Sequence, residues 1–118
     1  MSGDTQPFDT SYLNQVFQGN KALVIEIIEM FLEQVPNFVK LMEDYSREGN
    51  FSAIQPLAHK SKSSSSMLGL KSIESILIDI EMCCKLGKYD SLPEKIQALR
   101  EQLNLCTEQI TKYVTDQK

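Results

Sequence analysis

The chain has 118 residues, of which 42% are hydrophobic and 24% charged, which is enough apolar material to bury the core of one compact domain. Its formal net charge of −4 gives no general attraction to phosphate backbones and argues against a general nucleic-acid-binding protein. Three cysteines, two of them adjacent, and a single histidine exclude a disulfide framework and a structural zinc site built from Cys and His.

Glycines at positions 19, 49, 69 and 87 divide the chain into five predicted helical segments. The first segment covers residues 8–17, is short, and has Asp9 and Thr10 as candidate N-caps. Residues 1–7, which precede it, are predicted to form a flexible N-terminus.

The second segment, residues 20–45, has apolar side chains at intervals of three and four, which is the spacing of an amphipathic helix. Pro36 lies in its middle, where proline cannot donate a backbone hydrogen bond and its ring clashes with the preceding turn. The sequence therefore predicts either a kink at Pro36 or two helices in line.

The third segment, residues 50–68, contains four consecutive serines, Ser63 to Ser66, a composition that by itself suggests a linker. The helical spacing of apolar and small residues nevertheless continues through them to Leu68, which favours a helix. At its start, Ser52 and Gln55 have the spacing of a capping box, and Asn50 is an alternative cap one or two residues earlier.

The fourth and fifth segments have equally regular apolar stripes. The fourth begins at Leu70 and is predicted to end at Gly87 in a left-handed cap. The fifth begins at Ser91, which forms a predicted capping box with Glu94 around a proline, and its stripe continues to Tyr113. Residues 115–118 are predicted to be a flexible tail.

No segment has the alternation of a strand, and the connections between the long helices are short. Short connections place successive helices antiparallel to one another. The predicted fold is therefore all-α, an antiparallel up-down four-helix bundle with a short extra N-terminal helix, in a single domain over residues 8–114.

The single histidine, His59, lies roughly 140° around its helix from the core residue Ile54, at about 100° per residue, and so faces solvent. No acidic residue occurs between Glu48 and Glu74, whereas Lys60, Lys62 and Lys71 lie in that interval. The histidine therefore belongs to a predicted basic island, residues 49–73. The side chains on its face of the helix or beside it are Gln55, Lys60, Lys62, Ser63 and Ser66.

These residue types suit one kind of chemistry. An imidazole is largely neutral near pH 7 and is then a nucleophile. Lys62, one turn away, is placed to stabilise negative charge on an incoming phosphoryl group, and serine hydroxyls can donate hydrogen bonds to its oxygens. No glycine-rich nucleotide-binding motif is present, so the site can accept a phosphoryl group but cannot activate ATP. By geometry alone, an ordinary surface histidine remains the alternative.

The stretch from Leu57 to Leu70 resembles the signature of the HPt family, the histidine-containing phosphotransfer domains of bacterial and eukaryotic phosphorelays. Ser63 stands where many members have glycine, and Ser61 replaces a residue that is usually apolar. The matching residues of the signature are Ala58, His59, Lys62, Ser63, Ser64 and Gly69, and the flanks that resemble the family are Asp9 to Leu13, Gly19, Asn20, Phe31, Leu32 and Pro36.

The resemblance implies that His59 accepts a phosphoryl group from the aspartate of a response-regulator receiver domain and passes it to another receiver, while Lys62 neutralises phosphate charge. The implied partners are receiver domains and a sensor or hybrid histidine kinase, with magnesium held by the receiver and no metal or cofactor of the chain's own. We expect receivers to dock on the exposed face of the His59 helix and on Tyr12 and Val16 of the first helix.

We also expect a monomer in the cytoplasm that contacts neither nucleic acid nor membrane. The location and the lack of membrane contact are expected because no apolar stretch can span a bilayer and the N-terminus lacks the features of a secretion signal. The main alternative is a non-catalytic helical adaptor, a degenerate member of the same family. The dimerising histidine domain of a sensor kinase is a weaker alternative, since such domains usually have an acidic residue where this chain has Lys60.

Overall fold

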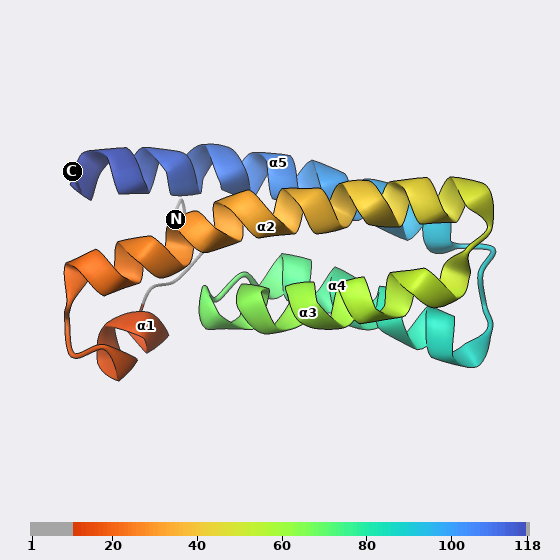
Figure 1. Cartoon of the computed structure of the whole chain (residues 1–118), viewed down its shortest axis with the longest axis horizontal. Coiled ribbons are helices and arrows are strands. Elements are labelled where there is room, and N and C mark those ends of the chain that lie inside the picture. Colours follow the sequence, from red (N-terminus) through yellow and green to blue (C-terminus); the bar gives the residue numbers. More distant parts are fainter. Residues whose placement is uncertain (1–10, 118) are drawn as a thin grey trace, which may run out of the picture.

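A computed structural model of the chain describes residues 11–117 and contains only helices and turns within that range (Figure 1). The four long helices lie side by side along the long axis, and the short first helix lies at one end. This confirms the all-α four-helix bundle with an extra N-terminal helix. The elements are α1 (Ser11–Val16), α2 (Lys21–Glu48), the 3₁₀ turn η1 (Phe51–Ala53), α3 (Ile54–Met67), α4 (Lys71–Leu86) and α5 (Leu92–Gln117).

Left-handed glycines end the helices where the sequence predicted the breaks. Gly49 and Gly87 have φ angles of 74° and 70°, a conformation that costs glycine little. After Gly87, the backbone N–H of Lys88 donates a hydrogen bond to the carbonyl of Cys83 at 2.9 Å, which gives a partner to a carbonyl in the last turn of α4. The predicted cap is confirmed, and each short break lets the next helix pack antiparallel.

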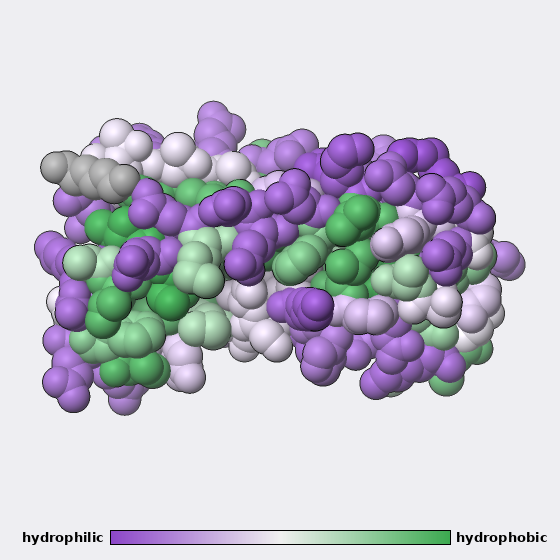
Figure 2. All heavy atoms as spheres, viewed as in Figure 1, coloured by the Kyte–Doolittle hydropathy of each residue, from purple (hydrophilic) through white to green (hydrophobic). Residues whose placement is uncertain are grey.

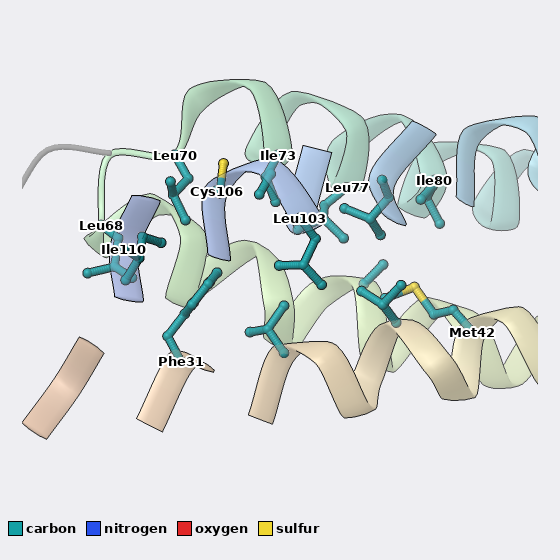
Figure 3. Close-up of a cluster of buried hydrophobic side chains, with 14 of the residues drawn as sticks. Phe31, Met42, Leu68, Leu70, Ile73, Leu77, Ile80, Leu103, Cys106 and Ile110 are labelled. Carbon is teal, nitrogen blue, oxygen red and sulfur yellow. The ribbon is translucent and has the colours of Figure 1, made fainter. Parts of the chain in front are cut away.

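The core lies between the four long helices. Figure 3 shows apolar side chains from α2, α4, α5 and the turn between α3 and α4 pointing into one shared interior. Full burial of a large aliphatic side chain stabilises a fold by about 1.5–3 kcal/mol. The labelled residues, all buried, are Phe31, Met42, Leu68, Leu70, Ile73, Leu77, Ile80, Leu103, Cys106 and Ile110.

Helix α2 runs without a break through Pro36, so the predicted alternative of two helices in line is wrong. Val35 and Val39, on either side of the proline, are completely buried, and their packing holds the helix together despite the lost hydrogen bond. The side-chain amide of Asn37 donates to the carbonyl of Glu33 at 3.2 Å, in the turn that the proline disturbs.

Helix α3 begins differently from the prediction. The capping box of Ser52 and Gln55 does not form, because the chain enters the helix through η1 and no side chain caps either element. The N–H of Ala53 bonds instead to the carbonyl of Asn50 at 3.3 Å. Pro56, in the first turn of α3, has no N–H that needs a partner.

The serine run is helical, as its register predicted, and no linker interrupts α3. Ser61 and Ser65 are completely buried on the inward side. The Ser65 hydroxyl donates to the carbonyl of Ser61 at 2.8 Å, whereas the Ser61 hydroxyl has no hydrogen-bond partner among the described residues. One buried polar group therefore lies beneath the exposed face of α3 without compensation.

We expect Ser61→Ala to raise the free energy of unfolding by about 1 kcal/mol, because an unpaired buried hydroxyl is removed and alanine favours a helix. Urea unfolding followed by circular dichroism measures the change. Ser65→Ala is the matched control: it lies one turn further along and is equally buried, but its hydroxyl is paired, so it should give no gain. An equal effect of both substitutions would contradict the prediction.

The C-terminal end of the chain is more regular than predicted. Helix α5 continues to Gln117, three residues into the segment for which we predicted a flexible tail, and Thr115 donates to the carbonyl of Thr111 at 2.9 Å. The predicted caps Asp9 and Thr10 and the predicted flexible N-terminus, residues 1–7, lie outside the described residues. None of the described helices has the length and apolar character needed to cross a membrane.

Candidate functional site

His59 lies in the middle of α3 with its side chain 63% exposed, as its position in the helical register predicted. Its ring is nevertheless fixed on one side. The Nδ1 atom lies 3.0 Å from Oε2 of Glu81, a residue of α4 that is 22 positions further along the chain. The histidine is therefore open to solvent at one end of the ring and held by a neighbouring helix at the other.

Glu81 is the residue that organises the site. Its side chain is only 9% exposed, and each carboxylate oxygen has its own partner. Oε2 faces the His59 ring, and Oε1 accepts a hydrogen bond from Nζ of Lys62 at 2.8 Å. A buried carboxylate is stable only when it is paired in this way.

The carboxylate determines which nitrogen of His59 is nucleophilic. An ionised carboxylate can only accept hydrogen bonds, so in the neutral imidazole the proton must lie on Nδ1. The lone pair then lies on Nε2, at the end of the ring away from Glu81. The exposed nitrogen of His59 is thus the one that can attack an electrophile.

The surroundings keep Glu81 ionised. The hydrogen bond from Lys62 lowers the pKa of Glu81 most, and the hydrogen bond to His59 and the charges of Lys62 and Lys85 lower it further, whereas burial acts in the opposite direction. The balance leaves the pKa below its ordinary value of 4.5. At neutral pH, Glu81 is therefore an anion that holds the Nδ1 proton in place.

This shift makes stability depend on pH in a defined window. The contribution of Glu81 is fully present above its ordinary pKa of 4.5 and is lost as the pH falls through its lower pKa in the folded protein. As the pH falls below 4.5, the free energy of unfolding should fall more steeply for the wild type than for Glu81→Gln. Urea titrations at several pH values measure both slopes, and equal slopes would show that Glu81 is not the group responsible.

An open hollow of about 450 Å³ lies beside the histidine, between α3 and α4. Its size and its bordering amines suit a small anionic group or an acidic loop of a partner. The residues that line it are Ser52, Gln55, Pro56, His59, Lys60, Glu81 and Lys85.

The structure gathers some of the predicted site residues and separates others. Gln55 and Lys60 line the hollow together with His59. Ser63 and Ser66 are exposed on α3 but are not among the lining residues. Lys62 is present at the site, but its side chain is engaged with Glu81 and only 29% exposed.

Part of the positive charge of the predicted basic island is therefore neutralised by Glu81. The interval without acidic residues is real along the chain, but folding brings Glu81 into it from α4. Sequence reasoning missed Glu81, although a signal was present. It follows Leu77 by four residues and precedes Cys84 by three, so it is a charged residue within the apolar stripe of α4.

Tyr12 and Val16 do not reach the histidine hollow. They are 56% and 50% exposed on α1, which packs against α2 at the end of the bundle where α3 finishes. Figure 2 shows a hydrophobic area at this end of the molecule and a smaller one just right of the centre, with polar residues around both. An apolar groove of about 130 Å³ lies between α2 and α3, lined by Ile27, Met30, Phe31, Gln34, Ser64, Met67 and Leu68.

The cysteines take no part in this site. Cys83, Cys84 and Cys106 are free thiols, and none lines the hollow. Burial raises the pKa of Cys84 and of Cys106, which keeps both thiols protonated and unreactive. Within residues 11–117, no group of three or more His, Cys, Asp or Glu side chains could hold a metal ion.

Comparisons with known proteins give a match to a family model and a likeness in fold. The model of the family described as "Hpt domain" matches residues 26–110, a range that includes His59, Lys62 and Glu81. The crystal structure of histidine-containing phosphotransfer protein B (HptB) from Pseudomonas aeruginosa PAO1 is similar in fold, with a TM-score of 0.86 over 96% of this chain and 98% of that chain at 13% identity. No curated protein sequence matches.

Proposed function

Because the family model matches most of its length, this chain belongs to the Hpt domain family and functions in histidine phosphotransfer within phosphorelays, and from that premise we propose that His59 carries the phosphoryl group. One observation supports this choice most strongly. His59 is exposed, and the buried carboxylate of Glu81 holds its Nδ1 at 3.0 Å, so its Nε2 lone pair is free. It is also the only histidine in the chain.

The transfer step follows from this arrangement. The Nε2 lone pair attacks the phosphorus of an aspartyl phosphate on a receiver, the N–P bond forms, and the bond from phosphorus to the aspartate oxygen breaks. The electron pair of that bond leaves with the aspartate carboxylate. The proton on Nδ1 stays where it is, and Glu81 balances the positive charge that develops on the ring. Transfer to the next receiver reverses these events.

Lys62 has two roles in this proposal. One N–H of its ammonium group is used on Oε1 of Glu81, at 2.8 Å, which fixes the carboxylate for His59. An ammonium has three N–H groups, so the others remain for an oxygen of the phosphoryl group. Lys62 would thus stabilise phosphate charge without leaving Glu81.

The partners of this family in a phosphorelay are response regulators and histidine kinases. We place their docking surface on the exposed side of α3, including Gln55, Lys60, Ser63 and Ser66, and on Tyr12 and Val16 of α1. The exposed apolar side chains of α1 support this choice. The interface would be modest in area, because a carrier must release each partner.

In this proposal the protein acts as a cytoplasmic monomer that makes no contact with nucleic acid or membrane. Magnesium is held by carboxylates of the receiver, and the chain supplies no metal or cofactor of its own. The ion would neutralise phosphoryl charge on the receiver side, while this chain supplies the nucleophile and its orientation.

The proposed function is tested with receiver domains carrying a ³²P-labelled aspartyl phosphate, incubated with this protein and magnesium. Label should move to this protein, and it should be lost in acid, as expected for a phosphoramidate. A panel of receivers is needed because transfer depends on the cognate partner. If label stays on every receiver although some of them bind this protein, the non-catalytic adaptor is the better account.

A further inference from the structure

We propose that Lys85 of α4 is a second cation for the phosphoryl group on His59 and sets how strongly this protein holds that group. The proposal rests on the proposed function of His59. It concerns a residue outside the α3 motif, on a different helix from the histidine. Three observations carry it: the charge balance around Glu81, the position of the Lys85 ammonium, and the hollow that it shares with His59.

The charge balance leaves a need for another cation. Lys62 and Glu81 form a close pair, with 2.8 Å between Nζ and Oε1, so their charges largely cancel. A phosphoryl group brings about one to two additional negative charges at neutral pH. Lys62 cannot move fully onto that group without removing the main partner of a buried carboxylate.

Lys85 is close enough to meet this need and free enough to move. Its Nζ lies 3.9 Å from Oε2 of Glu81, which is the same oxygen that faces Nδ1 of His59. This separation is too long for a hydrogen bond, and the side chain is 54% exposed. The ammonium is thus held near the histidine by charge attraction, without a bond that must be broken.

The shared hollow gives the phosphoryl group a place between them. His59 and Lys85 both line the open space of about 450 Å³ between α3 and α4. A phosphoryl group on Nε2 would be attached to a ring that borders this space, and the Lys85 side chain on the other wall is long and flexible enough to extend toward it. An exposed ammonium and an exposed phosphoryl group still attract each other across this space, and dissolved salt weakens the attraction.

Lys60 lines the same hollow but is less suited to this role. Adjacent residues on a helix point about 100° apart, so Lys60 and His59 do not face each other. Lys85 approaches from the opposite wall and is attracted to the carboxylate that orients the ring. We therefore assign Lys60 to the partner's docking surface and Lys85 to the phosphoryl group.

The test compares Lys85→Gln with the matched control Lys88→Gln. Both substitutions remove one exposed positive charge within four residues of each other, but Lys88 lies beyond the end of α4 and does not line the hollow. Each variant is mixed with a labelled receiver until the label stops moving, and the fraction on His59 is measured. Lys85→Gln should shift this equilibrium toward the receiver by about three- to fivefold, and Lys88→Gln should leave it unchanged.

Three further measurements separate a direct effect on the phosphoryl group from an effect on docking. Lys85→Arg should restore the equilibrium, because it keeps the charge, and the effect of Lys85→Gln should shrink at high salt. Affinity for the unphosphorylated receiver should be unchanged in Lys85→Gln. A loss of that affinity equal to the shift in equilibrium would make Lys85 a docking residue and overturn the proposal.

The outcome is distinguishable from failure of the proposed function. If the wild type takes no label, His59 is not a phosphoryl carrier with that receiver, and the test is made with one that does transfer. If the wild type takes label on His59 and both glutamine variants behave like it, the assignment of Lys85 is wrong and the function stands.

Discussion

Transfer of a phosphoryl group to this protein is expected to disappear when His59 is replaced by glutamine. An amide nitrogen has no lone pair available for attack on phosphorus, and the chain has no second histidine. The His59 side chain is 63% exposed, so its removal costs little packing. Labelled transfer from a phosphorylated receiver measures activity, and thermal melts by circular dichroism should show an unchanged fold.

The control for this experiment is Asn104→Gln, an exposed position on α5, which contributes no residue to the hollow. It should transfer at the wild-type rate. Label on His59→Gln at a rate near that of the wild type would place the acceptor elsewhere in the chain. A His59→Gln variant that melts much earlier would show that the ring has a structural role through Glu81.

Replacing Glu81 by alanine is expected to slow transfer by about tenfold to a hundredfold, the size found for groups that orient metal-binding histidines in the same way. The substitution removes the acceptor for the Nδ1 proton, so the proton can move to Nε2, the nitrogen that must attack. It also frees Lys62 from its 2.8 Å contact. Stability should fall by about 1–2 kcal/mol, since two hydrogen bonds are lost.

Glu81→Gln should lie between the wild type and Glu81→Ala. An amide has one acceptor oxygen where the carboxylate has two, so it can serve either His59 or Lys62 but not both. The ¹⁵N chemical shifts of the His59 ring report which nitrogen carries the proton. Wild-type protein should show it on Nδ1, and Glu81→Ala should show a larger share on Nε2. An unchanged proton position in Glu81→Ala would contradict the assigned role of the carboxylate.

The sequence was a good guide to whatever depends on local periodicity. The apolar stripes predicted the helices, and the glycines at positions 49 and 87 predicted their ends, because each depends on residues within one or two turns. His59 was found in the same way, since its exposed face follows from its angular distance from Ile54. Its neighbours on α3 were found by the same projection.

The features that were missed depend on contacts between helices. Glu81 reaches His59 only because α3 and α4 pack together, and a charge count along the chain cannot include a residue that arrives from another helix. Pro36 was expected to kink α2 or to divide it into two helices in line, but α2 is one helix, and burial of Val35 and Val39 keeps it continuous. At η1, a 3₁₀ turn replaced the capping box, so tertiary geometry overruled a local motif.

Because His59 lies on α3 and the carboxylate that orients it lies on α4, the rate of phosphoryl transfer depends on native packing between these two helices. A partly denatured state that keeps its helices but loosens their contacts would retain its circular dichroism signal while the Nδ1 proton lost its fixed acceptor. Transfer activity would then fall at a lower denaturant concentration than helicity does. A molecule whose helices have loosened would therefore accept phosphoryl groups more slowly while its helix content is still native.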